Sequence, residues 1–157
     1  MSRHDPVLGI GEAALRLGVT PMALRLYERR GIVLPARTAS GRRLYSQHEI
    51  EIIRCARALV GEDGLNLEGV RHLLGQVRCW TVKRCSPVDR AACPVTLHPA
   101  GPCWSVERTP CRERDEDCRA CAVYRELPGC RTVKSRIRTA AGRRADQPPG
   151  PPRDRRN

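Results

Sequence analysis

Apolar residues recur at helical spacing through the first half of the chain. Over residues 10–17, the small and apolar side chains of Ala13, Ala14 and Leu17 fall on one face of a helix. Gly18 follows at once and can take the positive φ that often ends a helix. The pattern predicts a first helix whose small inward residues allow a second helix to cross closely.

The next stretch, TPMALRLYERRG, predicts that second helix. Thr20 can cap it with its hydroxyl, and Pro21 suits the first helical position, where a missing N–H does no harm. Leu24 and Tyr27 lie three residues apart and share one face. The other faces carry Arg25, Glu28, Arg29 and Arg30. A helix-turn-helix with an apolar back and a cationic front is typical of proteins that read the major groove of DNA.

Residues 32–45 contain no helical periodicity. Pro35, Ser40 and Gly41 punctuate this stretch and predict a short β-hairpin with its turn near residues 39–41. Three arginines lie on this hairpin, namely Arg37, Arg42 and Arg43, with Tyr45 at its base. The hairpin is therefore expected to form a basic wing beside the second helix.

Two more helices complete this half. Ser46 and Glu49 have the spacing of a capping box, which starts a third helix. Its apolar stripe is expected at Ile50, Ile53, Ala56 or Arg57, and Val60, before a break at residues 61–64. Asn66 is placed to cap a fourth helix that ends at Gly75 and turns Leu67, Val70 and Leu74 inward.

Composition and charge point to a polyanionic partner. The chain has 157 residues, no Phe and 3% aromatic residues, so a single large core is not expected. Its formal net charge of +12 is uneven: residues 1–78 carry +4, residues 79–130 carry +1 and residues 131–157 carry +7. Two basic ends indicate nucleic acid, most simply double-stranded DNA. The alternative is that the arginines only keep the protein soluble.

The segments LRLYERRG, PARTASGRRLYS and GLNLEGV resemble the winged-helix DNA-binding domain of the MerR family, most of all its heat-shock repressor branch, HspR. The resemblance covers residues 9–75 and implies a sequence-specific transcription regulator, with repression of stress or chaperone genes if it extends to function. It also implies DNA contacts by Thr20, Pro21, Met22, Arg25 and Tyr27 on the second helix, and by Arg37, Arg42, Arg43 and Tyr45 on the wing.

The resemblance stops after Leu74. MerR proteins continue into a long helix that pairs antiparallel with its twin, whereas here Gly75 to Arg78 leads directly into Cys79. The family's route to a homodimer, and activation by untwisting a promoter, are therefore not expected. A homodimer on DNA formed by another route stays open, as does contact with RNA polymerase or another protein.

Eight of the nine cysteines lie in residues 79–130, which contain an internal repeat, CWTVKR and CWSVER, and a late CxxCxxY motif. These features resemble the bacterial two-CW cysteine-tryptophan domain, a likeness that implies no particular chemistry. A segment so poor in large aliphatic residues is not expected to fold without metal or cross-links. We expect metal ligands at Cys79, Cys85, Cys93, Cys103, Cys111, Cys118, Cys121 and Cys130.

The spacing leaves the metal open. Eight thiols are enough for two zinc ions or for one iron–sulfur cluster with spare cysteines. The domain either senses metal or redox state for the DNA-binding half, or is a structural zinc module that binds a partner protein. Disulfides in an exported protein are less favoured. Cys55 is expected to be an inert buried thiol, and His72 and His98 are expected at the surface.

A thiol oxidoreductase using Cys118 and Cys121 is the enzymatic alternative. No βαβ pattern surrounds this CxxC, and the neighbouring Asp115, Glu116 and Asp117 are expected to raise the thiol pKa, which disfavours a reactive thiolate. We therefore expect that the protein is not an enzyme.

The sequence thus predicts a mainly α chain in four regions. These are a flexible lead (1–8), a winged helix-turn-helix (9–76), an irregular metal-stabilised cysteine-rich domain (77–130) and a basic Pro/Arg-rich tail (131–157). The tail is expected to be largely disordered, with a short basic helix on DNA as an option at its start. No stretch has the length of a signal peptide or a membrane span, so we expect a cytoplasmic protein.

Overall fold

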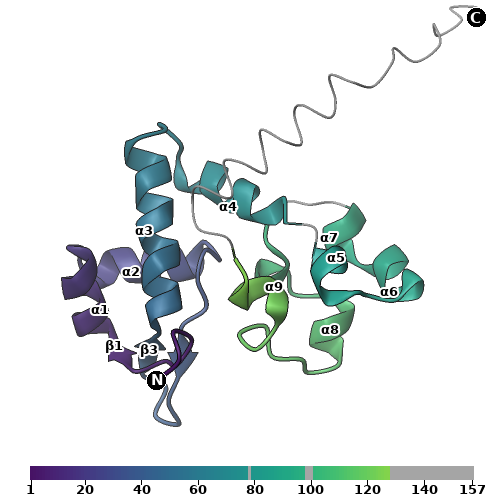
Figure 1. Cartoon of the computed structure of the whole chain (residues 1–157), viewed down its shortest axis with the longest axis horizontal. Helices are drawn as coiled ribbons and strands as arrows, with labels where there is room; N and C mark the ends of the chain where they lie inside the picture. Colours follow the sequence, from purple (N-terminus) through teal and green to yellow (C-terminus); the bar gives the residue numbers. More distant parts are fainter. Residues whose placement is uncertain (78, 98–100, 128–157) are drawn as a thin grey trace, which may run out of the picture.

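Four helices and a three-stranded sheet make up the first half of the molecule (Figure 1). This computed structural model describes residues 1–77, 79–97 and 101–127. The elements here are α1 (Ile10–Leu17), α2 (Pro21–Arg29), α3 (Gln47–Gly61), α4 (Leu67–Gly75), β1 (Leu8–Gly9), β2 (Ala36–Arg37) and β3 (Arg43–Tyr45). The predicted winged helix-turn-helix of four helices and a hairpin is confirmed.

Three of these helices begin at the side-chain caps that the sequence predicts. Thr20 and Asn66 each accept a hydrogen bond from the backbone N–H three residues on, at 3.2 and 2.7 Å. At α3, the Ser46 side chain accepts the Glu49 N–H, while the Glu49 carboxylate accepts the Ser46 N–H at 2.7 Å. Each cap satisfies backbone donors that a first helical turn leaves free, so local sequence sets these helix starts.

The core of this half lies where α1 packs on α2 and on α3. Ala13 and Leu24 are completely buried there, as the apolar pattern predicts. The stripe of α3 differs from its prediction, because Val60 is 38% exposed while Ile52 and Leu59 are buried. The reason is that α3 contacts both α1 and α4, so its buried face is wider than a single stripe.

The sheet has the order β1–β3–β2, and both pairings are antiparallel. The turn of the wing contains Gly41 with a φ of +79°, as expected for the tip of the hairpin. The lead that was expected to be flexible contributes β1, in which Leu8 pairs with Tyr45. The Arg3 carbonyl also accepts the His48 N–H at 2.9 Å, so the lead is fastened to both β3 and α3.

Short helices joined by loops form the described part of the cysteine-rich region. They are α5 (Cys79–Lys83), α6 (Pro87–Ala92), α7 (Pro94–Leu97), a 3₁₀ helix (Cys103–Ser105), α8 (Pro110–Glu113) and α9 (Ala122–Arg125). In the described part of this region, therefore, no long helix follows α4. No helix in the described ranges is long and apolar enough to cross a membrane. Cys130, His98 and the tail from 131 onward lie outside the described residues.

The cysteine-rich region packs directly on the winged helix. At the end of α4 the two backbones approach closely, since a Cβ on Gly75 would lie 2.7 Å from the carbonyl carbon of Gly101. α9 faces α3 (Figure 1), and the ring Nε2 of His48 is 2.8 Å from the carbonyl oxygen of Tyr124. The winged helix and the cysteine-rich region therefore share an interface. The winged helix is not a separate module joined to the rest of the chain by a free linker.

Candidate nucleic-acid interface and cysteine-lined cavity

The first turn of α2 is open to solvent. Thr20, Pro21 and Arg25 are exposed, and Met22 is 65% exposed. The Thr20 hydroxyl caps the helix by accepting the Ala23 N–H, which holds this turn in place. The N-terminus of α2 therefore presents Thr20, Pro21 and Met22 to solvent. The cationic side chain of Arg25 follows about one helical turn later.

Glu28 joins α2 to the wing. Its carboxylate accepts a hydrogen bond from Arg37 Nη2 at 2.7 Å and another from Arg43 Nε. The hydrogen bond to Glu28 raises the pKa of Arg43. This pair of charge-assisted bonds fixes the wing beside the helix, a role for Glu28 that the sequence pattern did not reveal.

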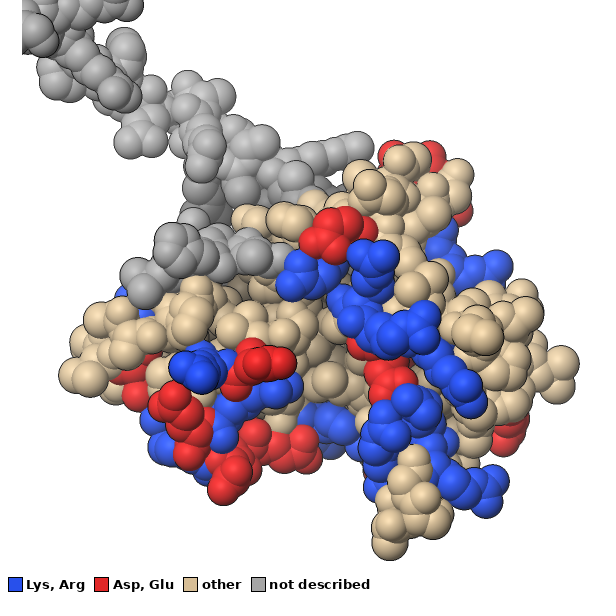
Figure 2. Space-filling model, turned by 180° about the vertical axis from the view of Figure 1, so that it is seen from behind, with Lys and Arg blue, Asp and Glu red and all other residues tan. Residues whose placement is uncertain are grey.

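Basic side chains gather over the wing on one face of the molecule (Figure 2). Figure 2 shows Lys and Arg gathered over the wing at the lower right, with further basic side chains above it. Glu28 partly neutralises the two wing arginines that it binds, whereas Arg25 on α2 and Arg42 on the wing are exposed. Neither forms an ion pair with the residues that the structure describes.

Two of the DNA-contact residues implied by the resemblance lie in the core instead. Tyr45 is completely buried and Tyr27 is 9% exposed. Burial raises the pKa of Tyr45 to about 12, and that of Tyr27 also rises through burial. Tyr45 lies on β3, the central strand of the sheet, where it pairs with Leu8 of β1. The structure thus buries both rings, and DNA contact by either tyrosine stays a prediction.

Seven cysteines line one cavity of about 50 Å³ on the far side of the molecule from α1. They are Cys79, Cys85, Cys93, Cys103, Cys111, Cys118 and Cys121, all with free thiols. The structure thus brings together every expected metal ligand except Cys130, which lies outside the described residues. Within those residues, no three His, Cys, Asp or Glu side chains are close enough together to hold a metal ion as they stand.

The thiols of this cavity differ in acidity. A hydrogen bond from the Cys103 thiol lowers the pKa of Cys79 to about 7, and the same bond raises the pKa of Cys103. Burial raises the pKa of Cys118, partly opposed by Arg112. The expected direction for the CxxC thiol is therefore right, but burial is the principal cause and not the acidic neighbours.

Two aromatic residues connect this cavity to the winged helix. The indole N–H of Trp104 donates to the Gly31 carbonyl at the end of α2, at 2.8 Å. The Tyr124 hydroxyl accepts the Leu34 N–H at 2.9 Å and donates to the Glu49 carboxylate at 3.0 Å. The CW and CxxCxxY motifs mark both residues in the sequence, but nothing in the motifs indicates where the rings point.

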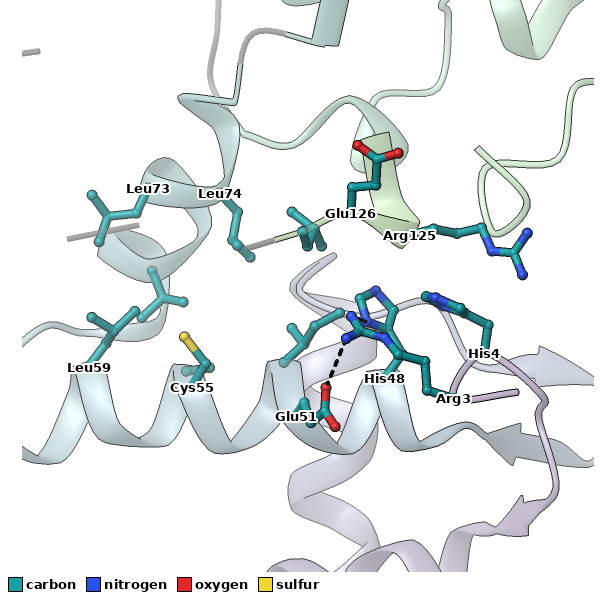
Figure 3. A pocket seen from close by; sticks show the side chains of 14 residues that line it. Arg3, His4, His48, Glu51, Cys55, Leu59, Leu73, Leu74, Arg125 and Glu126 are labelled. Carbon is teal, nitrogen blue, oxygen red and sulfur yellow. Dashed lines mark hydrogen bonds and ion pairs between the residues drawn. The ribbon is translucent and has the colours of Figure 1, made fainter. Parts of the chain in front are cut away.

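A larger cavity of about 630 Å³ lies between α3, α4 and the lead (Figure 3). Its wall is apolar at Leu59, Leu73 and Leu74 and polar at Arg3, His4, His48 and Glu51. Cys55 also lies on this wall and is disulfide-bonded, so the expectation of an inert thiol is wrong. Leu127 lies at the rim of this cavity, and the residues after it lie outside the described ranges. We therefore assign no ligand to the cavity.

The comparisons with known proteins agree with the first half of this description. Residues 8–77 match the family described as "MerR HTH family regulatory protein". Over 74 residues the chain is 38% identical to "Putative heat shock protein HspR" of Streptomyces coelicolor (strain ATCC BAA-471 / A3(2) / M145). The match covers 47% of this chain and 49% of that protein, so the chain spans about half the length of the curated relative it matches. The family is one of regulatory proteins, as expected for this half of the chain. Residues 8–77 of this chain therefore form a helix-turn-helix domain of the MerR family.

Proposed function

We propose that this protein is a sequence-specific DNA-binding regulator of transcription. The first turn of α2 enters the major groove, with Thr20, Pro21 and Met22 near base edges and Arg25 on a phosphate. The wing contacts the neighbouring DNA backbone through Arg42. Arg37 also contacts this backbone, although Glu28 neutralises part of its charge. A regulator of this kind acts in the cytoplasm, where bacterial DNA lies.

The observation that supports this proposal is the basic face itself. The α2 side chains at its centre are exposed, the wing is held against α2 by Glu28, and Arg25 and Arg42 lack ion-pair partners among the described residues. Cations with no acidic partner are available to replace the counterions of DNA phosphates. The face therefore combines base-reading positions with phosphate-binding positions on one rigid frame.

The likeness to the HspR protein extends the proposal to genes of the stress response, which would be repressed when the protein occupies their promoters. The described part of the cysteine-rich region holds no long pairing helix. If two copies bind neighbouring half-sites, they meet through another surface, and RNA polymerase is a further candidate partner.

The test begins with enrichment of bound sequences from a pool of random DNA duplexes, using the full chain. Binding of the enriched duplex is then measured by fluorescence anisotropy at several salt concentrations. Arg25→Ala should weaken binding to every duplex and reduce the salt slope by about 1. The matched control is Arg90→Ala, an exposed arginine on α6, remote from α2 (Figure 1). Unchanged affinity of Arg25→Ala at moderate salt would show that α2 is not the recognition helix.

A further inference from the structure

A short connector, residues 30–35, joins α2 to the wing. α2 ends at Arg29 and β2 begins at Ala36, so the connector itself forms neither helix nor strand. The side chains of Ile32 and Val33 are completely buried, which anchors its middle in the core. Because the connector is the covalent link between α2 and the wing, its path sets the angle between these two elements.

Both ends of the connector are bonded to the cysteine-rich region. At one end the Gly31 carbonyl accepts the indole N–H of Trp104 at 2.8 Å. At the other end the Leu34 N–H donates to the Tyr124 hydroxyl at 2.9 Å, and the Leu34 carbonyl accepts the Arg119 Nε–H at 2.9 Å. These two partners of Leu34 lie 90 and 85 positions further along the chain. Side chains of the cysteine-rich region thus satisfy backbone groups that a neighbouring strand would otherwise have to satisfy.

Leu34 is the residue from which the wing departs. Pro35 follows it and has no N–H to donate, and the residue before a proline favours an extended backbone. β2 then begins at Ala36. Since both backbone groups of Leu34 are held from the cysteine-rich region, its bonds fix the point at which the wing starts.

The two side chains that bind Leu34 are themselves held by one carboxylate. The Glu49 carboxylate accepts the Tyr124 hydroxyl at 3.0 Å and lies 3.5 Å from Arg119 Nη2. Glu49 is buried and belongs to α3, where it forms the capping box. Burial strengthens such charge-assisted bonds, so α3 orients both partners of Leu34.

Trp104 is held by contacts within the cysteine-rich region. Its carbonyl accepts Arg112 Nη2 at 2.7 Å, and its ring meets that of Tyr124 edge to face, with centroids 5.2 Å apart. The adjacent Ser105 packs so closely on Gly31 that a Cβ there would lie 2.6 Å from the Ser105 Cβ. The indole N–H is therefore kept on the Gly31 carbonyl by packing on several sides.

We propose that Trp104, Arg119 and Tyr124 are positioning residues for DNA binding, which hold the connector so that α2 and the wing meet the duplex at one fixed angle. They act through the connector and not by contact with DNA, since the side chains of Trp104 and Tyr124 are 2% exposed. This inference rests on the proposed function for its DNA readout. It gives the folded cysteine-rich region a direct part in DNA recognition.

A fixed angle matters because α2 and the wing must engage the duplex together. Met22 on α2 and Arg42 on the wing lie on elements that are joined covalently only by the connector. A connector free to change direction would have to be ordered on binding, and that ordering lowers affinity. Loss of the clamp should therefore weaken specific binding more than non-specific binding, which needs only phosphate contacts.

The first experiment measures DNA affinity of Tyr124→Phe and Arg119→Gln in the full chain, at a temperature at which circular dichroism shows each variant to be folded. Tyr124→Phe keeps the ring and removes the hydroxyl that accepts the Leu34 N–H. Arg119→Gln removes the guanidinium that binds the Leu34 carbonyl. Each variant should bind the enriched duplex about tenfold more weakly, as expected for loss of one positioning hydrogen bond. Wild-type affinity in both variants would overturn the proposal.

Two matched variants serve as controls. Tyr45→Phe removes a buried hydroxyl that has no hydrogen-bond partner among the described residues, and Arg108→Gln removes an exposed arginine of the same region as Arg119. Both should bind the enriched duplex as the wild type does. The salt slope on random duplexes should be the same in Arg119→Gln and in the wild type. A slope lower by about 1 would show that Arg119 binds a phosphate directly, and would overturn its positioning role.

Hydrogen exchange without DNA separates this proposal from the proposed function. Exchange at the Ile32 and Leu34 amides should be faster in Arg119→Gln than in the wild type and in Arg108→Gln, while exchange in α1 should be unchanged. This readout stands even if the enrichment experiment yields no sequence. Unchanged exchange at both amides would refute the clamp and leave DNA binding untouched. Faster exchange throughout the chain, α1 included, would show that Arg119 has a purely structural role.

Discussion

The hydroxyl of Tyr124 donates a hydrogen bond to the carboxylate of Glu49, 3.0 Å away, across 75 positions of sequence. Glu49 is 1% exposed and already serves the capping box of α3. Burial raises the pKa of Tyr124, so the hydroxyl keeps its proton and remains a donor. Arg119 lies 3.5 Å from the same carboxylate. A charge buried in the DNA-binding half is thus stabilised by the cysteine-rich half.

Tyr124→Phe should lower the free energy of unfolding by about 1–3 kcal/mol, because it removes one partner of a buried carboxylate and leaves the Leu34 N–H without its acceptor. Urea denaturation of the full-length chain measures this. Tyr45→Phe is the control, since the Tyr45 hydroxyl is buried and has no hydrogen-bond partner among the described residues. That change should be neutral or stabilising. A smaller loss for Tyr124→Phe than for Tyr45→Phe would contradict the assignment.

Gly31→Ala should destabilise the protein in two ways. Gly31 has a φ of +67°, which costs about 1–2 kcal/mol for a residue with a Cβ, and that Cβ would also collide with Ser105. Gly64→Ala isolates the first cost, because Gly64 has a φ of +68° and nothing within 4 Å of a Cβ. The midpoint of thermal unfolding should be lower for Gly31→Ala than for Gly64→Ala. Adding Ser105→Gly to Gly31→Ala should remove most of this difference. Equal midpoints for the two alanine variants would rule out the close contact.

Glu28→Gln should increase non-specific DNA binding. Loss of the carboxylate charge frees Arg37 and Arg43 to contact phosphates, so the salt slope should steepen by about 1–2. Discrimination between the enriched duplex and random DNA should fall, because the wing is no longer fastened to α2. Anisotropy titrations over a salt series measure both. Glu12→Gln on α1, which breaks the exposed pair with Arg16, is the control. A shallower slope for Glu28→Gln would contradict the proposed role.

The stability of the winged helix should fall as the pH drops from about 7 to about 5. Burial lowers the pKa of His48 below its ordinary value, and Arg3 lowers it further, against the raising effect of its Tyr124 hydrogen bond and of Glu49 and Glu51. The unfolded chain therefore takes up the proton first, so stability is full above the unfolded pKa and is lost below it. The pKa of His4 is also lowered, again mainly by burial, and acts in the same direction.

His48→Gln can still donate to the Tyr124 carbonyl and should flatten this pH dependence without abolishing it, because His4 remains. The check is urea unfolding at several pH values, with the exposed His72→Gln as the control. A pH profile of His48→Gln that follows the wild type would show that His48 does not titrate differently on folding.

Local signals in the sequence were enough to predict the architecture of the first half. The caps at Thr20, Ser46 and Asn66 and the turn at Gly41 depend on interactions within a few residues, so each could be recognised before the chain was folded. The same holds for the amphipathic pattern of α1 and α2. The clustering of eight cysteines in residues 79–130 was likewise visible in the sequence, whereas their role as metal ligands stays a prediction.

Contacts between distant residues could be seen only in the folded chain. Burial of Tyr45, neutralisation of two wing arginines by Glu28, and the meeting of seven thiols at one cavity each join separate elements. The CW motif identifies Trp104 in the sequence but does not indicate where its ring points. In the structure its indole N–H donates to the carbonyl of Gly31, which lies 73 positions away in the sequence. Hydrophobic periodicity specifies which face of an element is buried, whereas the partner that covers it is selected by packing of the whole chain.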